Sequence, residues 1–235
     1  MQYMTTIDER GKTGLPSWIR VDVGLASPLR VKFLITNHGS ASLIASHTYY
    51  ATQLDRHPQW SQSLIVFHEN DPDGVDLNMT FSGTPAGEAF GEAEVPITIP
   101  GVNHAIKFKF LLKGNPFSKK SPFVDARDLE DEPVMGIIGM NFLNDDYLHC
   151  VMQFGRSNLP PEMGNFGLKL MGDIAPFCAW CLDSSPGVKK AKCGGSCGGR
   201  SMYCRGKGCQ KKDWKAYHSQ KCSKSNANGV VAYPW

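Results

Sequence analysis

The last quarter of the chain carries an array of cysteines that constrains its fold more than any other feature. Seven of the eight cysteines fall between residues 178 and 222, and the only histidine of this region lies among them. Most of them come in pairs three to five positions apart, a spacing typical of zinc ligands, because a tight turn lets two thiolates converge on one ion. Eight ligands make two tetrahedral sites. The eight residues are Cys178, Cys181, Cys193, Cys197, Cys204, Cys209, His218 and Cys222.

Disulfides and free buried thiols are weaker explanations of this array. The first residues of the chain, MQYMTTIDERGK, contain no apolar stretch like that of a secretory signal. No apolar run is long enough to span a membrane. We therefore expect a cytoplasmic or nuclear protein without membrane association, in a reducing compartment where structural disulfides are rare. Free buried cysteines would not cluster in a stretch so poor in large aliphatic residues.

Charge and cysteine content change at the same place in the sequence. Residues 175–235 hold eleven lysines and arginines against two aspartates, whereas residues 1–174 are acidic overall. Two shifts at one place indicate a domain boundary near residues 170–177. We predict four segments, which are an N-terminal extension over 1–16, a β-rich domain over 17–170, a metal-binding domain over 175–223 and a flexible tail over 224–235.

The metal-binding segment has too small an apolar core to fold alone. Each structural zinc ion contributes on the order of 10–16 kcal/mol of binding free energy, which is ample to fold such a segment. With four protein ligands each, both sites would be closed to water and therefore structural. We expect residues 1–170 to stay folded when loss of His218 unfolds the tail.

The ending YC-x4-CQKKDW-x3-H-x3-C resembles the second half of a MYND-type zinc finger. The resemblance implies that the eight ligands interleave. One zinc would bind Cys178, Cys181, Cys204 and Cys209, and the other would bind Cys193, Cys197, His218 and Cys222. Three spacings are one residue longer than is usual in the family, and the neighbouring glycines would absorb the insertions at low steric cost.

The same resemblance implies a role in docking to other proteins. MYND fingers commonly bind short proline-containing peptides, and the expected helix over residues 209–222 would carry Gln210 and Trp214 as partner-binding residues. Trp214 and Tyr217 could equally belong to the core of the finger. The lysines of this region leave a zinc-dependent nucleic-acid binder as a further alternative, although a solvated basic face is the usual meaning of such a run.

The larger segment is mainly β in character. Short β-branched or alternating runs are separated by turn formers, a pattern that predicts an all-β domain shaped as a small barrel. Short helices are expected only at HTYYATQLDR and MNFLNDD. Cys150, in a predicted strand, is expected to be a buried small hydrophobe. The predicted strands are WIRVDVGL, RVKFLITNHG, ASLIASHTYY, SLIVFH, DLNMTF, AEVPITIP and AIKFKFLL.

Two passages of this domain resemble a retropepsin-like aspartic protease. VKFLITNHGSASLIA has the strand, glycine turn and second strand that surround the family's catalytic Asp-Thr/Ser-Gly. VMGIIGMNFL resembles the family's late glycine-containing strand and the short helix after it. Between them, residues 83–101 occupy the place of the flap hairpin. The resemblance implies a possible homodimer, since each retropepsin subunit supplies one catalytic aspartate.

The sequence departs from the family at the catalytic position. Alignment on Gly39 places Asn37 at the catalytic aspartate and His38 at the Thr/Ser. An asparagine amide cannot take a proton from water, so the two-carboxylate mechanism is lost. The prediction is a non-enzymatic adaptor with a degenerate protease-like domain and a zinc finger. An active retroviral-type aspartic endopeptidase with an unusual site, or an unrelated β-barrel with an ordinary turn at TNHGS, are the alternatives.

Overall fold

The structure is a computed structural model of the 235-residue chain. None of the helices that it describes is both long enough and apolar enough to cross a lipid bilayer. It describes residues 18–26, 28–35, 41–67, 89–99, 102, 104–118, 120–123, 133–146, 148, 150–154, 166–172, 174–195, 197, 200–220, 222 and 231–232.

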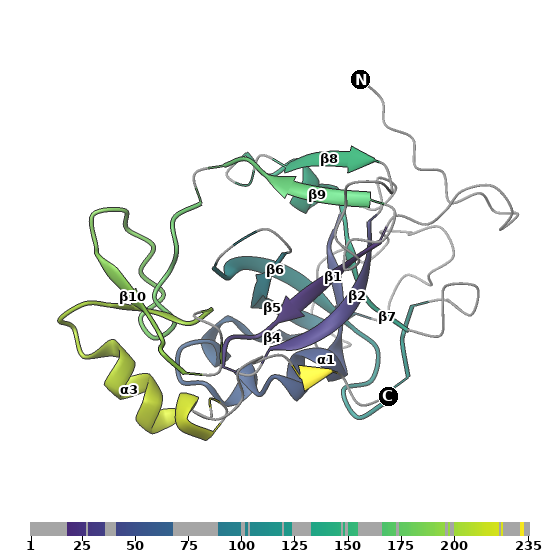
Figure 1. The fold of residues 1–235 in the computed structure, drawn as a ribbon. Coiled ribbons are helices and arrows are strands. Elements are labelled where there is room, and N and C mark those ends of the chain that lie inside the picture. The colour runs from purple at the N-terminus through teal and green to yellow at the C-terminus, as the bar shows by residue number, and fades with distance from the viewer. Residues whose placement is uncertain are drawn as a thin grey trace, which may run out of the picture.

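Six strands close into a β-barrel, which confirms the mainly β prediction (Figure 1). Along the ring the order is β1-β2-β7-β3-β6-β5, and pairing of β5 with β1 closes it. Alternation explains β5, where Ala93, Val95 and Ile97 are fully buried while Glu92 and Glu94 are partly exposed. The strands are β1 (Trp18–Val23), β2 (Leu29–Ile35), β3 (Leu43–Ala45), β5 (Ala89–Thr98), β6 (Ile106–Lys113) and β7 (Val134–Ile138).

β7 lies between two strands that follow each other in the chain. It runs parallel to β2 and antiparallel to β3. Gly136 stands opposite Phe33, and a Cβ on this glycine would come within 2.4 Å of the Phe33 ring, so only glycine leaves room for the aromatic side chain. The backbone N–H of Gly139 donates to Ser42 Oγ at 3.0 Å, and Ser42 Oγ donates to Asn141 Oδ1 at 2.8 Å. The two passages that carry the protease resemblance are therefore side by side.

Several predicted elements differ in extent from the observed ones. The predicted strand over 41–50 ends at Ala45, after which α1 (Ser46–Ala51) begins. The short helix predicted after β7 is present as α2 (Met140–Leu143). The strand predicted over 76–81 lies outside the described residues, as do residues 83–88, 100 and 101 of the expected flap. The described part of the flap segment contains β5. Three short elements lie between α1 and β5 in the sequence, and the last of them, β4, pairs with β5. They are η1 (Leu54–Arg56), η2 (Ser61–Ser63) and β4 (Ile65–Val66).

The C-terminal part begins after a separate hairpin of β8 and β9. Its own elements are a two-stranded hairpin and a helix of eight residues followed by a single 3-10 turn. A last short strand, β12, runs parallel to β2. The remaining residues of the predicted flexible tail lie outside the described residues, so that tail stays a prediction. The elements are β8 (Cys150–Phe154), β9 (Phe166–Leu170), β10 (Lys190–Lys192), β11 (Met202–Cys204), α3 (Cys209–Ala216), η5 (His218–Gln220) and β12 (Val231–Ala232).

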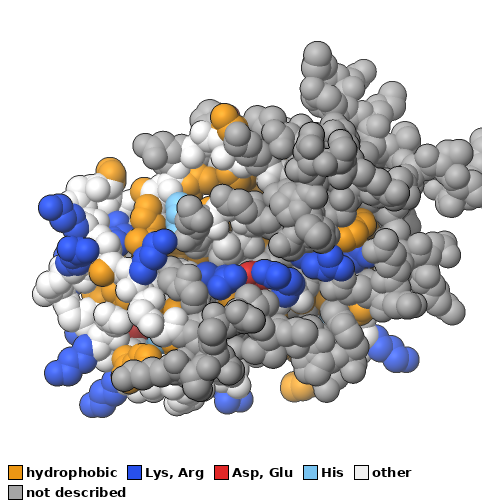
Figure 2. All heavy atoms as spheres, in the orientation of Figure 1, with side chains coloured by type: hydrophobic (Ala, Val, Ile, Leu, Met, Phe, Trp, Pro, Cys, Tyr) orange, Lys and Arg blue, Asp and Glu red, His pale blue; other side chains and the backbone are white. Residues whose placement is uncertain are grey.

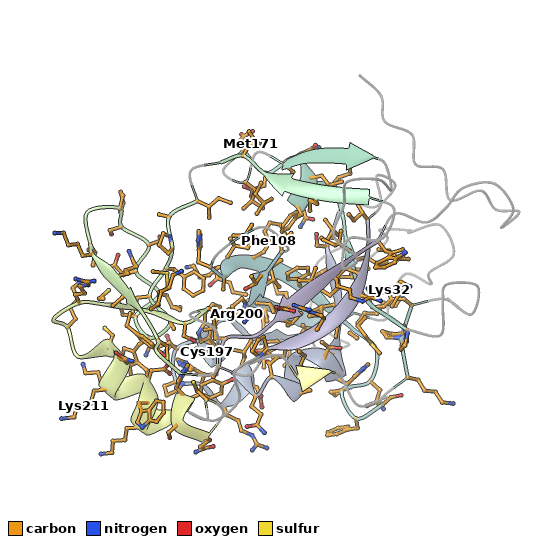
Figure 3. The ribbon with its side chains drawn as sticks, viewed as in Figure 1. Lys32, Phe108, Met171, Cys197, Arg200 and Lys211 are labelled. Atoms are coloured by element: carbon orange, nitrogen blue, oxygen red, sulfur yellow. The ribbon has the colours of Figure 1, made fainter. Side chains whose placement is uncertain are left out.

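The barrel and the Cys-rich part share one continuous core. Trp60, fully buried, packs its ring 5.5 Å from that of Phe177 and donates its Nε1–H to the carbonyl of Ala179 at 3.2 Å. At the edge of this interface Arg200 reaches Asp22 of β1, with Nη2 at 2.6 Å from Oδ2 (Figure 3). Burial of aromatic side chains across the interface means that each part contributes to the stability of the other.

Candidate metal centres

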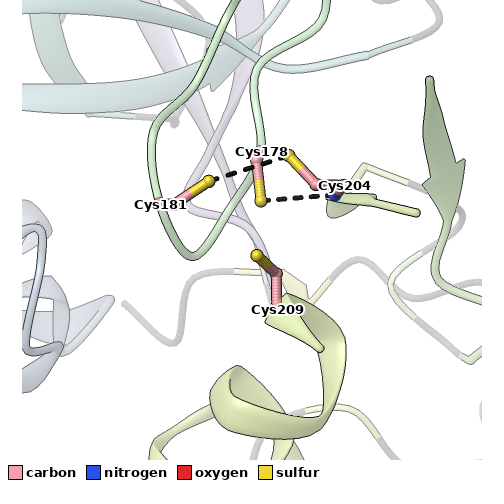
Figure 4. A group of neighbouring side chains, drawn as sticks. All are labelled: Cys178, Cys181, Cys204 and Cys209. Carbon is pink, nitrogen blue, oxygen red and sulfur yellow. Dashed lines mark hydrogen bonds between the residues drawn. The ribbon is translucent and has the colours of Figure 1, made fainter. Parts of the chain in front are cut away.

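The first group of candidate ligands consists of four cysteines (Figure 4). The Sγ atoms of Cys178, Cys181, Cys204 and Cys209 all lie within 4.8 Å of one another. Cys181 Sγ and Cys204 Sγ are 3.7 Å apart, far longer than a disulfide bond. Sulfurs bound tetrahedrally to one zinc at about 2.3 Å would be about 3.8 Å apart. The spacing of these sulfurs therefore fits a common tetrahedral ion.

The second group contains three cysteines and the histidine. The ligand atoms of Cys193, Cys197, His218 and Cys222 also lie within 4.8 Å of one another, and all four residues are buried. Cys193 Sγ is 3.3 Å from His218 Nε2 and 3.9 Å from Cys222 Sγ. Nε2 is thus the ring nitrogen that faces the sulfurs.

Local structure explains why the two groups interleave. A turn closed by the Leu182 N–H donating to the Cys178 carbonyl at 2.9 Å brings the first pair of cysteines together. The hairpin of β10 and β11 places Cys193 at the end of one strand and Cys204 at the end of the other. Helix α3 then begins at Cys209 and leads to the last two ligands. Alternate ligand pairs therefore meet, in the same two groups that the MYND resemblance implies.

Glycines accommodate the long spacings of the sequence. Gly206 and Gly208 adopt φ values of 78° and 66°, a left-handed conformation that other residues rarely adopt, within the loop between Cys204 and Cys209. Gly195 lies against the second group, and a Cβ at this position would come within 2.4 Å of Cys222 Sγ. The sulfurs can approach the backbone here only because the residue is glycine.

Burial disfavours the charged form of several of these side chains when no cation is bound. Burial raises the pKa of Cys193 to about 12, and the neighbouring Cys197 adds to the effect. Burial also raises the pKa of Cys204 to about 11 and that of Cys209 to about 12. A divalent ion supplies the missing positive charge and deprotonates coordinating thiols. Burial lowers the pKa of His218, so its ring is neutral, which is the form that binds metal. Thiolate and imidazole donors in groups of four suit zinc.

Two residues outside the sequence-predicted set contact the histidine of the second group. Its Nδ1 is 3.0 Å from the hydroxyl of Tyr203 and 3.5 Å from Oδ2 of Asp213. Asp213 is buried and also reaches His57, from the barrel segment, at 2.9 Å. The sequence held a signal for Asp213, since it is one of only two acidic residues in a strongly basic segment. Nothing in the sequence pointed to His57.

The residues predicted to bind a partner lie beside a surface pocket. Trp214 is 38% exposed and, with the exposed Gln210, lines a pocket of about 610 Å³ next to Cys204 and Cys209. Tyr217 instead is buried, and its hydroxyl donates to the carbonyl of Thr52 in the barrel. The two aromatic residues left open by the sequence therefore have different places, Trp214 at the surface and Tyr217 in the interface.

The positions predicted to correspond to the protease site, Asn37, His38 and Gly39, lie outside the described residues, between β2 and β3 in the chain. Cys150 is half-buried, and its Sγ lies 3.3 Å from the carbonyl oxygen of Phe142, apart from both ligand groups.

Comparison of the sequence with known proteins and protein families finds no match: no family model matches the chain, and no curated protein matches it either. The chain is therefore characterised by its structure, in which two groups of four ligands, seven of the eight buried and each group able to hold a metal ion, follow a closed β-barrel.

Proposed function

We propose that this protein is a zinc-dependent adaptor, in which a MYND-type finger over residues 175–223 docks to other proteins. The observation that carries the proposal is the convergence of eight ligand atoms into two interleaved groups, each within 4.8 Å. Four protein ligands complete a tetrahedral zinc, so neither ion would keep a position open for water. Both ions would be structural, and the role of the finger would be recognition.

The pocket beside α3 is the proposed docking surface, and its proposed occupant is a proline-containing peptide. Trp214 offers an exposed ring, and Gln210, four residues earlier, lies on the same side of the helix. An exposed aromatic ring packs well against the rigid, extended backbone of a proline-rich segment. The side-chain amide of Gln210 can both donate to and accept from the peptide backbone.

The barrel is proposed to be a retropepsin-like domain without protease activity. The support is topological, because the two passages that carry the resemblance form β2, β3 and β7, and β7 inserts between the other two. Short helix α2 also follows β7, as the resemblance implies. Asn37 at the position of the aspartate removes the general base. Dimerisation through this domain stays a prediction.

Native mass spectrometry should find two zinc ions per chain. Cys181→Ser and Cys193→Ser should each reduce the count to one, because each removes a ligand from a different group. Cys150→Ser is the matched control and should keep both ions, since this thiol lies apart from both groups. A wild-type protein that carries one ion or none would refute the eight-ligand scheme.

Peptide docking should depend on the exposed tryptophan. We expect Trp214→Ala to weaken binding by roughly thirtyfold, the effect of losing an interface hot spot of about 2 kcal/mol. Fluorescence polarisation with labelled proline-containing peptides, and with versions in which alanine replaces proline, would measure this. Lys212→Ala is the control, because this exposed residue of α3 does not line the pocket. Equal binding by both variants would contradict the proposed surface.

A further inference from the structure

A network of buried polar side chains connects the barrel to the second metal centre. It begins at His57, between η1 and η2, and passes through Asp213 and Tyr203 to His218. None of the four is more than 2% exposed. Polar groups buried to this degree need hydrogen-bond partners. The direction of each hydrogen bond in this network follows from which of its atoms can donate and which can only accept.

The hydrogen bonds of His57, at the barrel end of this network, have a fixed donor and acceptor. His57 Nδ1 accepts hydrogen bonds from the backbone N–H groups of Gln59 at 3.1 Å and Trp60 at 3.4 Å. In the neutral ring the proton must therefore be on Nε2. This Nε2–H donates to Oδ1 of Asp213 at 2.9 Å. The tautomer of His57 is thus set by the barrel backbone.

The same direction continues to the metal ligand. An ionised carboxylate only accepts, so the hydroxyl of Tyr203 donates to Asp213 Oδ2, at 2.6 Å. Because the only O–H of Tyr203 points at Asp213, the Tyr203 oxygen accepts a hydrogen bond from Nδ1–H of His218 at 3.0 Å. The lone pair of His218 then sits on Nε2, the atom 3.3 Å from Cys193 Sγ.

We propose that His57, Asp213 and Tyr203 are positioning residues of the second metal centre, which hold His218 in the tautomer whose Nε2 lone pair faces the three cysteines. The proposal rests on the proposed zinc binding. It makes the barrel a contributor to the metal affinity of the finger, across a sequence separation of 156 residues between His57 and Asp213. Groups that orient a metal-bound histidine typically change metal affinity by about 10–100-fold.

Asp213→Asn tests the proposal with almost no change in shape. Because His57 Nδ1 is held as an acceptor, its Nε2–H must meet the new amide oxygen, and the amide NH2 then faces Tyr203. The tyrosine hydroxyl would turn to donate to His218 Nδ1, which moves the ring proton to Nε2. We expect the second site to bind zinc about 10–100-fold more weakly, while the first site, made of four other cysteines, keeps its affinity.

Two measurements on the full-length protein separate the possible outcomes. Competition with a graded series of chelators gives the affinity of each site, and 15N NMR of histidine-labelled protein shows which nitrogen of His218 carries the proton. Two zincs held equally by wild type and variant, or a wild-type proton on Nε2, would overturn the proposed positioning role and leave zinc binding intact. A wild type without zinc would instead overturn the proposed function.

Variants of the barrel residue distinguish positioning from general stability. His57→Gln can present an amide N–H to Asp213, whereas His57→Leu cannot, so glutamine should restore much of the second-site affinity that leucine loses. Tyr217→Phe is the matched control. It removes a buried hydrogen bond between barrel and finger, from Tyr217 to the Thr52 carbonyl, that is not part of this network. Equal loss of second-site affinity in His57→Gln, His57→Leu and Tyr217→Phe would mean that the network only stabilises the interface and does not position His218.

Discussion

Exhaustive chelation should unfold the Cys-rich part of the protein and lower the thermal stability of the barrel. The expected loss is large, since each structural zinc contributes on the order of 10–16 kcal/mol while a whole domain is stable by only about 5–15 kcal/mol. Without the ions, thiols with a raised pKa, such as that of Cys193, stay neutral, and no shared cation holds them together. In the described part of this segment, β10, β11 and α3 cover only a small apolar core of their own, so beyond the ions they depend on contacts with the barrel.

The barrel is affected because the interface is buried. When the Cys-rich part unfolds, Trp60 loses its contacts with Phe177 and the Ala179 carbonyl, and His57 loses its contact with Asp213. A buried polar group left without its partner costs about 1–3 kcal/mol. We therefore expect the barrel to lose stability when the Cys-rich part unfolds, whereas the boundary predicted from the sequence implied only that residues 1–170 stay folded.

Hydrogen exchange followed by mass spectrometry measures both effects in one experiment. Amides of residues 178–222 should exchange as in an unfolded chain after metal removal, and those of β1 and β5 should lose part of their protection. Added zinc should restore protection and added magnesium should not, because magnesium prefers oxygen ligands. Unchanged protection after complete metal removal would contradict the structural role of the ions.

Trp60→Ala should be among the most destabilising single substitutions in the barrel. The side chain is fully buried where the barrel meets the Cys-rich part. Truncation of a buried tryptophan to alanine costs about 3–5 kcal/mol, through lost burial and the cavity that remains. The Ala179 carbonyl would also lose its 3.2 Å donor. Urea denaturation of the zinc-loaded protein measures the change in the free energy of unfolding.

Two further variants make this result specific. Trp60→Phe keeps an aromatic ring but no N–H, and should cost less than the alanine variant. Ile65→Ala is the surface control, because Ile65 is 52% exposed and such sites usually change stability by only about 0.5 kcal/mol. A Trp60→Ala effect as small as that of Ile65→Ala would mean that the interface contributes little.

The sequence by itself determined the features that depend on local spacing. Pairs such as Cys178 and Cys181 lie so close in the chain that a turn brings them together whatever surrounds them. Alternating runs such as that of β5 specify strands, and the short runs separated by turn formers predicted an all-β domain shaped as a barrel. The glycines in the loop before Cys209 were expected to relieve its length, and Gly206 and Gly208 do adopt left-handed conformations.

Only the tertiary structure decided how the two parts meet. His57 and Asp213 are 156 residues apart, and neither carries a local pattern that points to the other. Their contact depends on the packing of Trp60, Phe177 and Tyr217, side chains that the sequence could place only as generally apolar. Spacing fixes which neighbouring ligands form a pair, because it acts through a few bonds of chain. Which pairs lie close enough to share an ion was implied by the resemblance and is decided by the fold. The surroundings that orient those ligands come from distant segments, and their positions follow from how the whole core packs.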